Sequence, residues 1–562
     1  MTSMESYYVM LGLVALFLAI SAVIGMRDSR RQDEREKKRL LSAFGKRGNK
    51  EYPDGRFAQI PKYTQRHPGS FMIDDITWND LDMDSLFRSM DTTCSSAGEE
   101  YLYRLLRAPR MDGHIACSDP GMKWWAEHET ERVRIQRLLQ IPGRSGKYSI
   151  YDYLDLMEDL PSRSPVRDLP AVILPLISFV ILFFNPPVGI CCLLASFAFN
   201  MITYFKVKGR IDPYLFTFRY ILRLLECADR ISKEDFPNYD EEKGVMRSVY
   251  HSFKGFIRGS GILLRGSSGP ASGNPIDLLL DYLCILFHID LFKFGSMLGD
   301  LRGRKKEIDD LITAIGSVDA GISIASWRES LPFYCVPDLG GRDYEVTDLI
   351  HPLLENPVPN CIQTGRPVLL TGSNASGKST FLKAAALAAL LAQSVGSVPA
   401  RSYKGPCFRI FTSMALRDDI ESGESYFIVE IRSLKRILDA ASDSSGLPVL
   451  CCVDEVLRGT NTIERISASA EILDHLADTG IQVFAATHDI ELTELLKDKY
   501  SNYHFSETMS GDDVRFSYKL LEGPADSRNA IRLLRALGYD PRIADRAEER
   551  AGRFLETGRW EM

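Results

Sequence analysis

The sequence predicts an α/β domain in the C-terminal part of the chain, preceded by an all-α region and by apolar helices long enough to span a membrane. Three observations predict this fold class. After residue 345, short β-like runs alternate with helical stretches, as in a parallel sheet with crossover helices. Before it, the pattern is that of long amphipathic helices. Two blocks without a charged residue, 7–26 and 169–205, lie in the same part.

The length and composition of the chain indicate several folded units of ordinary type. The 562 residues exceed the size at which one core stops growing. A net charge of -7 gives no support to broad attraction for nucleic acid, so contact with a polyanion must be local. The eleven cysteines form no Cys-x-x-Cys pair and no dense framework, which favours buried thiols in a reducing compartment over disulfides or zinc.

Residues 1–26 are expected to be a transmembrane anchor. The uncharged run from Tyr7 to Met26 has 20 residues, and a helix of that length spans roughly 30 Å, the thickness of the hydrocarbon layer. A cleaved signal peptide is the alternative, but the basic residues follow the run and no Ala-x-Ala-like site does. Ten Lys or Arg residues between Arg27 and Lys50 predict a cell-membrane protein with its N-terminus outside and the following chain in the cytoplasm.

Residues 27–75 are polar and punctuated by Gly and Pro, so we expect a basic, polar linker with little core of its own. The second apolar block, 169–205, is interrupted at Asn185–Pro187, and each half is near the lower length limit for a span. We expect a helical transmembrane hairpin with both ends in the cytoplasm, because basic residues flank the block on either side. A buried helical pair inside a soluble domain is the alternative. The chain thus has one to three predicted spans.

The rest of the region 76–345 is predicted to be an all-α domain around that hairpin. One helix is expected to begin at Thr93 or Ser95, because either side chain is able to cap it. Residues 214–231 and 275–298 have the pattern of two further long amphipathic helices.

Residues 346–562 are predicted to form the α/β domain. Its strands are expected in three apolar runs: "RPVLL" (366–370), "LPVLCCVD" (447–454) and "IQVFAAT" (481–487). The last segment has the pattern of two helices joined at "GYDP", residues 538–541.

A phosphate-binding loop follows the first of these strands. Gly372, Gly377, Lys378 and Ser379 match the pattern Gly-x4-Gly-Lys-Ser/Thr, and a helical stretch begins there. Glycines allow backbone N–H groups and the helix N-terminus to face phosphates. Lys378 would add a positive charge at the terminal phosphates, and the Ser379 hydroxyl would coordinate magnesium. We therefore expect ATP and Mg²⁺ to bind here, with Thr380 as a further residue of the nucleotide site.

Two further strand ends carry the residues expected for hydrolysis. Asp454 and Glu455 close the second apolar run; Asp454 would hold the magnesium shell, and Glu455 would polarise the attacking water as the catalytic base. His488 follows the third run, at the edge where open α/β sheets bind ligands, and would sense the terminal phosphate. An exposed acidic pair and a structural histidine are the alternatives. The phosphate-binding loop upstream favours the catalytic interpretation.

From about residue 348 to 556 the sequence resembles the MutS family of DNA mismatch-repair ATPases, which are of the ABC class. The likeness rests on several motifs in one order: "HPLLENPVPN", "TGSNASGKSTFLK", "IFTSMALRDDIESGESYFIVEI", "VDEVLRGTNTIERISA", "FAATHDIELTELL" and "SRNAIRLLRALGY". Residues 75–109 are similar to the start of the family's helical lever domain. The resemblance implies an ABC-type P-loop ATPase domain that follows an all-α lever domain.

The resemblance also implies that two subunits form the nucleotide sites together, so we expect a homodimer through the ATPase domains. Asn374 matches the P-loop asparagine at the phosphates, and Ser425 matches the serine offered to the nucleotide of the partner subunit. Glu430 matches an acidic position of the signature region that contains this serine and acts in trans, on the nucleotide of the partner subunit. The segment Arg458–Asn461 matches a loop that communicates between subunits, and His488 matches the family's switch histidine.

The chain departs from the mismatch-repair members of that family in two ways. A membrane anchor and a linker are expected where those members carry a mismatch-reading domain, and no candidate for a Phe-x-Glu wedge is visible in residues 1–75. Val358 lies near the position where some relatives stack an aromatic ring on adenine, so the resemblance does not imply base stacking at this position of the chain. DNA contact would have to rest on phosphates, with Arg302, Arg304, Lys305 and Lys306 as candidates. Solvated helix ends are the alternative for these basic residues.

The sequence therefore predicts a Mg²⁺-dependent ATPase, membrane-anchored and dimeric, in which ATP binding and hydrolysis drive a clamp-like conformational change. DNA is the expected substrate, whether mismatched, branched or damaged, as in mismatch repair. The alternative is an ATP-driven switch that acts on a membrane or protein partner without binding DNA. A transporter is a weaker alternative, because three spans offer little for a substrate path.

Overall fold

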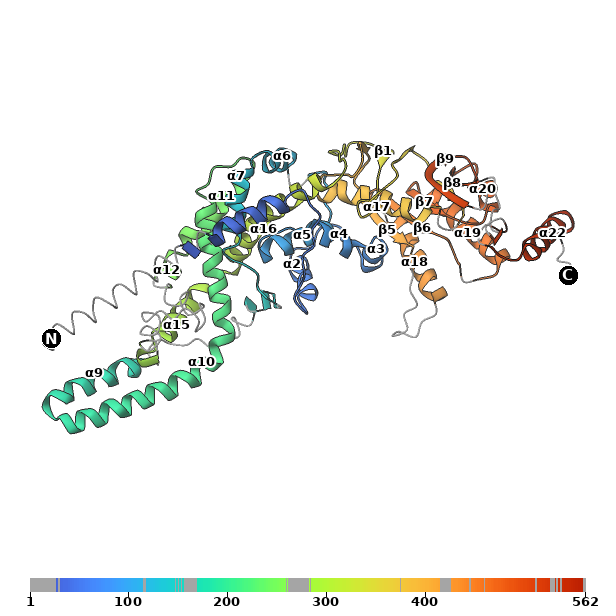
Figure 1. Ribbon diagram of the computed structural model, residues 1–562. Coiled ribbons are helices and arrows are strands. Elements are labelled where there is room, and N and C mark those ends of the chain that lie inside the picture. The colour runs from blue at the N-terminus through green and yellow to red at the C-terminus, as the bar shows by residue number, and fades with distance from the viewer. Residues whose placement is uncertain are drawn as a thin grey trace.

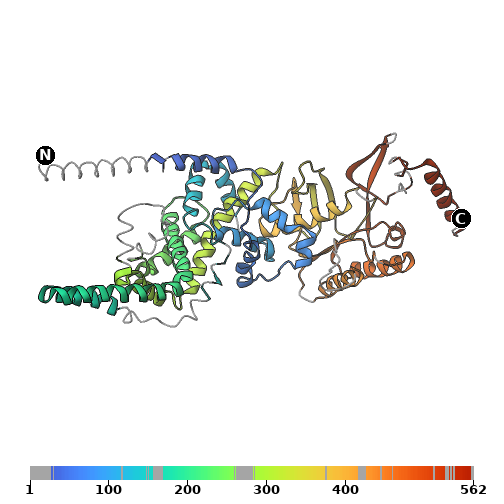
Figure 2. The same cartoon turned by 60° about the horizontal axis from the view of Figure 1, so that its bottom comes forward.

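The computed structural model describes residues 27–28, 31–114, 118–146, 148–149, 151–152, 154–155, 169–258, 260, 283, 285–373, 376–414, 426–443, 446–458, 460–510, 513–525, 531, 534–535 and 538–558. The expected anchor, residues 1–26, lies outside these ranges, as does most of the first helix of the expected C-terminal pair. In the described part, an elongated helical region is followed by an α/β domain. The apolar hairpin lies toward one end of the molecule and the C-terminal helix at the other (Figure 1 and Figure 2).

The α/β domain is built on a six-stranded mixed sheet with the order β5-β6-β7-β3-β8-β9. The first five of these strands are parallel, and β9 pairs with β8 in the antiparallel direction. The strands are β3 (Val368–Thr371), β5 (Arg409–Ser413), β6 (Val449–Asp454), β7 (Gln482–Ala486), β8 (Ser501–Ser510) and β9 (Asp513–Glu522). The three predicted strands are thus confirmed as β3, β6 and β7. In β6 the first five residues are all buried, as expected for a parallel strand covered on both faces.

Helices and a small second sheet cover the six strands. The helices are α17 (Lys378–Ser394), α18 (Tyr426–Ala441), α19 (Thr462–Asp478) and α20 (Glu491–Leu495). The second sheet is antiparallel, with the order β2-β1-β4, and consists of β1 (Tyr344–Leu349), β2 (Asn360–Thr364) and β4 (Ser402–Lys404). Nearly all of α17 is buried, so this helix forms the centre of the domain. The last helix, α22 (Pro541–Thr557), is the second of the two predicted at the C-terminus.

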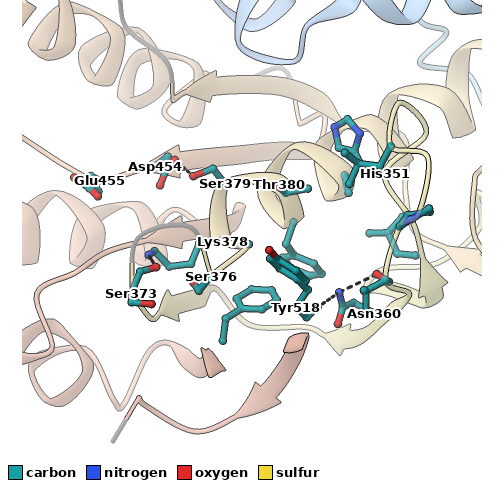
Figure 3. Close-up of a pocket in the computed structure, with 18 of the residues that line it drawn as sticks. His351, Asn360, Ser373, Ser376, Lys378, Ser379, Thr380, Asp454, Glu455 and Tyr518 are labelled. Atoms are coloured by element: carbon teal, nitrogen blue, oxygen red, sulfur yellow. Dashed lines mark hydrogen bonds between the residues drawn. The ribbon is translucent and has the colours of Figure 1, made fainter. Parts of the chain in front are cut away.

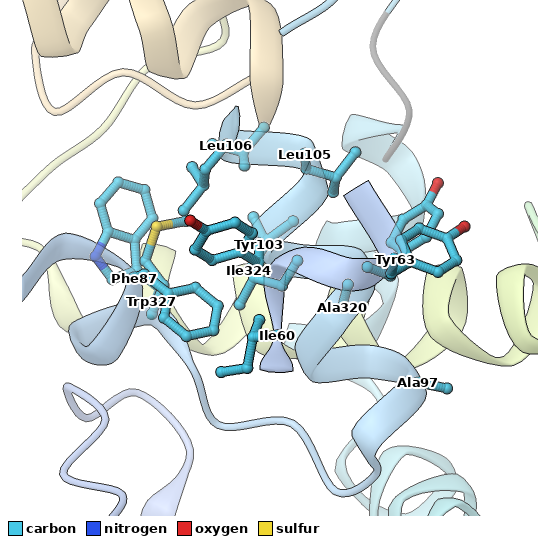
Figure 4. Close-up of a cluster of buried hydrophobic side chains, with 14 of the residues drawn as sticks. Ile60, Tyr63, Phe87, Ala97, Tyr103, Leu105, Leu106, Ala320, Ile324 and Trp327 are labelled. Atoms are coloured by element: carbon cyan, nitrogen blue, oxygen red, sulfur yellow. The ribbon is translucent and has the colours of Figure 1, made fainter. Parts of the chain in front are cut away.

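The helical region is arranged around one long central helix, α16 (Lys305–Ser330), which packs against α5, α6, α10 and α11. Its other elements are η1 (Phe57–Gln59), α2 (Pro61–Arg66), α3 (Asp75–Asp80), α4 (Met83–Met90), α5 (Ser96–Arg107), α6 (Asp119–Glu127), α7 (Glu129–Leu139), α9 (Leu169–Phe184), α10 (Pro186–Ile231), α11 (Asp240–Ser252), α12 (Lys254–Ile257) and α15 (Ile289–Leu301). Figure 4 shows aliphatic and aromatic side chains of α2, α5 and α16 packed in one cluster. The described residues before β1 are thus largely helical, as the sequence predicts.

The start of α5 is tied to α16 by a buried carboxylate. Ser95 caps α5, since its side chain accepts from the Gly98 N–H, so Ser95 rather than Thr93 is the cap. Asp319 of α16 accepts from the Cys94 N–H at 2.9 Å, from the Ser95 N–H at 2.8 Å and from the Ser95 hydroxyl at 2.6 Å. Burial raises the pKa of the Asp319 carboxyl to about 6, although these hydrogen bonds oppose the shift. The contact fixes the register of two helices far apart in the sequence.

Residues 27–75 differ from the expected linker, because their second half belongs to the core of the helical region. Arg56, Ile60 and Tyr63 are almost fully buried. Arg56 pairs with Glu99 and Glu100 of α5 at 2.7 and 2.9 Å. The polar composition suggested a solvated segment, but here the buried charges are neutralised by partners on another helix.

Two predicted helices of this region have different limits in the structure. Residues 214–231 are not a separate helix, because they continue α10 without a break from the apolar block. The helix expected over 275–298 is described only from its later part, and it is interrupted at His288, whose φ of 54° ends the preceding turn before α15 begins. A non-glycine residue in that left-handed conformation cannot continue an α-helix.

The apolar block forms the predicted hairpin. α9 and α10 lie side by side in opposite directions, with Asn185 as the cap of α10 between them (Figure 1 and Figure 2). Its large side chains face outward; Phe183 is 74% exposed and Phe184 is 85% exposed. The hairpin is therefore not a helical pair buried within the described chain. By length and composition alone, the segment Pro186–Gly209 of α10 is able to cross a membrane, and among the described residues it is the one helix that meets both criteria.

The packing of α5 on α16 predicts a large effect for a small substitution. A Cβ added at Gly98 would stand 2.3 Å from Oδ2 of Asp319, so Gly98→Ala must displace the carboxylate that holds the Cys94 and Ser95 N–H groups. We expect a loss of about 2–4 kcal/mol in the free energy of unfolding. The measurement is urea unfolding followed by tryptophan fluorescence, because Trp78, Trp124, Trp125 and Trp327 all lie in the helical region.

Gly244→Ala in α11 is the matched control, since nothing lies within 4 Å of the point where its Cβ would stand. Alanine is the better helix former, so the control should be neutral or stabilising by up to about 1 kcal/mol. Equal destabilisation by the two substitutions would contradict the account of the Gly98 contact.

Candidate active site

A cavity of about 420 Å³ lies where β3, β6 and β7 end. Because neighbouring parallel strands end at the same edge of a sheet, the segments that follow them come together. The predicted site residues that line the cavity are Gly377, Lys378, Ser379, Thr380, Asp454, Glu455 and His488. Figure 3 shows Lys378 and Glu455 toward one end of the cavity and His351 and Asn360 at the other.

The loop between β3 and α17 is shaped by two glycines. Gly372 has a φ of 141°, and a Cβ there would stand 2.8 Å from the backbone oxygen of Phe505. Gly377 has a φ of 112° and precedes α17 directly. A residue with a side chain would be strained at either position. The loop therefore passes close to β8 and delivers the N-terminus of α17 to the cavity, which is the arrangement that binds phosphate groups.

Lys378 and Ser379 are the first two residues of α17. The Lys378 ammonium donates to the carbonyl oxygens of Gly372 and Ser373 at 2.7 and 2.9 Å, so it lies across the loop. The Ser379 hydroxyl donates to the carboxylate of Asp454 at the end of β6. The Ser379 hydroxyl and the Asp454 carboxylate thus meet at the N-terminus of α17, and oxygen ligands of this kind are those that Mg²⁺ prefers.

Glu455 stands one residue beyond β6 in a left-handed backbone conformation, with a φ of 63°. Its N–H donates to the Ala486 carbonyl at 2.9 Å. One carboxylate oxygen contacts Nε2 of His488 at 2.6 Å, and the other accepts from the Arg458 guanidinium. The second ring nitrogen of His488 contacts the Gly372 carbonyl at 3.1 Å. His488 therefore bridges the predicted base and the phosphate-binding loop.

The charge of Glu455 is stabilised in this arrangement. Burial on its own would raise the pKa of the carboxyl, but the hydrogen bonds from Arg458 and His488 outweigh it and lower the pKa to about 2. A non-glycine residue at a positive φ costs free energy and persists where its surroundings hold it. Here the backbone contact to β7 and two side-chain partners hold it.

Glu430 lies beneath the same loop of its own subunit. Its side chain belongs to α18 and is 2% exposed. One carboxylate oxygen accepts from the Arg458 N–H at 3.2 Å. Burial raises the pKa of this carboxyl, and hydrogen bonds from the Arg458 and Leu457 N–H groups oppose the shift. The resemblance implied a role toward the partner subunit, whereas these contacts connect Glu430 to the loop that follows Glu455.

Among the cavity residues that were not identified from the sequence are Tyr518, Asn360 and His351. Tyr518 of β9 presents its ring to the cavity, and its backbone has a φ of 53°. Asn360 donates to the Tyr518 carbonyl at 3.0 Å and accepts from the Leu520 N–H at 2.8 Å. Val358 lines the cavity as well. Some 160 residues separate Asn360 from its partner, and no local pattern signals such a contact.

The third is His351, which lies at the same end of the cavity as Asn360 (Figure 3). Burial lowers the pKa of His351 to about 4. The ring is therefore neutral near pH 7, and it offers the cavity an uncharged polar group.

Other predicted site residues are not among the described residues that line the cavity. Asn374 and Ser425 lie outside the described residues. The four basic candidates for DNA phosphate contact lie between the end of α15 and the first turn of α16 in the helical region. Arg304 pairs with Glu307 at 2.9 Å, and its guanidinium lies 3.9 Å from the ring centre of Phe253.

Lys305 likewise pairs with Asp155 at 3.1 Å. Arg302 and Lys306 are exposed. At least two of the four are thus engaged by carboxylates of the same chain, which favours the interpretation as helix-end residues.

Comparison with known proteins agrees with the motifs. Residues 368–554 match the family model described as MutS domain V, an ATPase domain. The DNA mismatch repair protein MutS of Natronomonas pharaonis is 31% identical over 271 residues, which cover 46% of this chain and 31% of that protein. The corresponding protein of Thermotoga maritima is 32% identical over 272 residues, covering 46% and 33%. That of Symbiobacterium thermophilum is 36% identical over 253 residues, covering 42% and 28%.

The chain spans about a third of the length of the curated relatives it matches. The matched part includes β3, β6, β7 and the cavity residues that follow them. The chain thus carries a MutS-type ATPase domain behind a largely helical region, and the resemblance is confirmed for that domain.

The geometry of Glu455 predicts a separation of binding from turnover. Glu455→Gln keeps the size of the side chain but loses its charge and cannot take a proton, so it should retain ATP binding and lower the turnover number by about 10²- to 10⁴-fold. Lys378→Ala removes the ammonium at the loop and should weaken ATP binding itself. Titration with labelled ATP and a phosphate-release assay measure the two effects. Turnover of Glu455→Gln equal to that of the unmodified protein would refute the assignment of the base.

Proposed function

We propose that this chain is a membrane-attached, MutS-like ATPase that works as a dimer and couples ATP binding and hydrolysis to a clamp-like change on DNA. The observation that carries the proposal is the meeting of three features in one cavity. They are the ammonium group of Lys378, the contact of Ser379 with Asp454, and the pair formed by Glu455 and His488.

The residues present fit ATP with Mg²⁺. A Cβ at Gly372 would clash with the backbone of β8. The backbone of the loop is therefore free of a side chain at this point, which allows its N–H groups to approach phosphate oxygens closely. Ser376 lies in this loop, and its buried hydroxyl has no partner among the described residues. Ser379 and Asp454 supply oxygen ligands for the metal. When bound, Mg²⁺ neutralises charge on the phosphate oxygens during phosphoryl transfer.

In the proposed mechanism the chain's own groups bind, orient and move a proton. When ATP binds, the Lys378 ammonium exchanges its contacts with the carbonyl oxygens of Gly372 and Ser373 for contacts with the terminal phosphates. Glu455 holds the attacking water and takes its proton, while His488 orients the carboxylate through the 2.6 Å contact. Arg458 donates to one carboxylate oxygen of Glu455 and His488 contacts the other, so both oxygens have partners in this structure. Arg458 is therefore proposed to leave Glu455 before hydrolysis, which frees one oxygen for the attacking water.

A second subunit is proposed to complete the site. Ser425 precedes α18 directly in the sequence and matches the residue that the MutS family offers to the partner's nucleotide. Glu430 of the same helix contacts the backbone of Arg458. This connection supports a coupling between engagement of the partner and the position of Arg458 beside Glu455. Hydrolysis would then depend on dimer formation.

Membrane attachment is proposed through the anchor at residues 1–26 and through the hairpin of α9 and α10, with the ATPase domain in the cytoplasm. The hairpin supports this placement because its outward side chains are apolar along both helices. Lys206 and Lys208 follow the apolar part of α10, where basic residues favour the cytoplasmic face.

DNA is proposed as the substrate because the relatives that match the ATPase domain are named DNA mismatch repair proteins. One observation favours a second candidate, an ATP-driven switch without DNA. The carboxylates of Glu307 and Asp155 already pair with Arg304 and Lys305, two of the basic residues considered for phosphate contact.

DNA binding by the full chain in detergent decides between these two candidates. Homoduplex, mismatched and branched DNA are titrated at several salt concentrations, with and without ATP. The proposal expects binding whose logarithmic affinity falls linearly with the logarithm of salt concentration, because phosphate contacts release counterions. It also expects a change of affinity when ATP is added. Absence of DNA binding at low salt would contradict the proposal that DNA is the substrate and would favour the ATP-driven switch.

The cysteines of the chain test membrane attachment without any substitution. Cys191 of α10 and Cys361 of β2 are both exposed thiols. In intact membranes, a membrane-impermeant maleimide on the cytoplasmic side should label Cys361 and spare Cys191 until detergent is added, because the hairpin lies in lipid. Mass spectrometry of the labelled peptides measures both sites in one sample. Labelling of Cys191 as fast as Cys361 in intact membranes would contradict the placement of the hairpin.

A further inference from the structure

The end of the cavity away from Glu455 is formed by the loop 350–359, which connects β1 to β2 (Figure 3). A residue 306 positions earlier in the chain contacts this loop. Arg47 donates from Nη1 to the Leu353 carbonyl at 3.1 Å and from Nη2 to the Leu354 carbonyl at 2.9 Å. Leu354 itself lines the cavity. The segment that follows the expected anchor thus touches the wall of the nucleotide cavity.

The backbone that carries Arg47 is fixed on the helical region. The Gly45 N–H donates to the Ser326 hydroxyl of α16 at 3.1 Å, and the Gly48 N–H donates to the Ser89 carbonyl of α4 at 2.7 Å. A Cβ at Gly48 would approach a backbone oxygen of that region to 2.5 Å, so the two backbones are in close contact. Arg47 therefore extends from a held position toward the loop.

The loop contains no helix or strand, and it is held at both ends. The Ile350 N–H donates to the Pro399 carbonyl at 3.0 Å, and the Lys519 ammonium donates to the Pro359 carbonyl at 2.7 Å. Where Arg47 reaches the loop, the other hydrogen bonds are local: the Leu354 N–H donates to the His351 carbonyl at 3.2 Å, and the Leu353 N–H donates to Nδ1 of His351 at 3.3 Å. The carbonyl groups of Leu353 and Leu354 are adjacent acceptors. A guanidinium presents its donors in a planar fork that suits two neighbouring oxygens, and its charge strengthens both hydrogen bonds. One side chain is thus able to hold this part of the loop.

We propose that Arg47 is a positioning residue that holds the loop 350–359 against the helical region and thereby sets the affinity of the cavity for ATP. The inference rests on the proposed nucleotide site. Lys378 and Glu455 lie toward the opposite end of the cavity (Figure 3), so a displaced loop weakens binding and leaves the reacting end in place. Through the same contact, the affinity for ATP depends on the position of the helical region, and ATP binding in turn affects that position.

The test compares Arg47→Gln, Arg47→Lys and Lys46→Gln in the full chain in detergent. Arg47→Gln removes the charged fork, and we expect the Kd for labelled ATP and the KM to rise together by about 10-fold, with kcat within about twofold. Arg47→Lys keeps the charge but reaches the carbonyl groups with a single ammonium, so its Kd should be intermediate. Lys46 is a neighbour of the same charge, and Lys46→Gln should behave as the unmodified protein.

Several outcomes would overturn the inference. An unchanged Kd in Arg47→Gln means that the loop does not depend on Arg47. A fall in kcat at unchanged Kd means that the contact acts on the reacting end instead. If Arg47→Gln does not fold, as judged by its thermal unfolding curve, Arg47→Lys carries the test, and a Kd equal to that of the unmodified protein then counts against the inference. Absence of ATP binding by the unmodified protein would refute the proposed function itself. That failure is distinguishable from a failure of the role proposed for Arg47, in which the unmodified protein binds ATP.

Discussion

The structure of the site depends on one constraint, the common edge at which β3, β6 and β7 end. Each strand is short and apolar, and each is followed at once by a polar side chain or a glycine loop that leaves the sheet. Parallel pairing places these segments next to one another. Ser379 reaches Asp454, and Glu455 reaches His488, because the order of strands makes them neighbours at that edge. The left-handed backbone at Glu455 persists within this frame.

A second consequence concerns how the ends of the molecule are connected. α10 runs without a break from the apolar hairpin into the helical region, where it packs against α16. At the end of α16 the Arg328 guanidinium, which is 2% exposed, donates to the Ser397 hydroxyl at 2.5 Å and to the Gly396 carbonyl at 2.9 Å. These residues follow α17, the helix that starts at Lys378. Buried contacts thus connect the phosphate-binding helix with the helical region on which the hairpin is mounted, a physical basis for the proposed coupling.

The local patterns of the sequence were sufficient for β3, β6 and β7, for the phosphate-binding loop and for the residues that follow these strands, because each depends on neighbours within a few positions. The other strands of the main sheet, β5, β8 and β9, were not predicted. Long-range contacts were not predictable in this way. Tyr518 and Val358 line one cavity, and Arg47 reaches the loop 350–359, but neither arrangement leaves a periodic or compositional signal. The polar composition of residues 27–75 concealed buried ion pairs such as that of Arg56 with Glu99. The composition of a segment indicates how polar it is on average, but it does not indicate which partner an individual charged side chain contacts.

The central claim is that ATP is hydrolysed at a site that two copies of the chain complete. Phosphate release by the purified chain in detergent, measured with ATP and Mg²⁺ over a range of protein concentrations alongside its molar mass, tests that claim most directly. The account predicts that the rate per subunit rises with protein concentration and levels off as the mass doubles. A chain that stays monomeric and releases no phosphate, or one whose rate per subunit does not change with concentration while it remains a monomer, would contradict it.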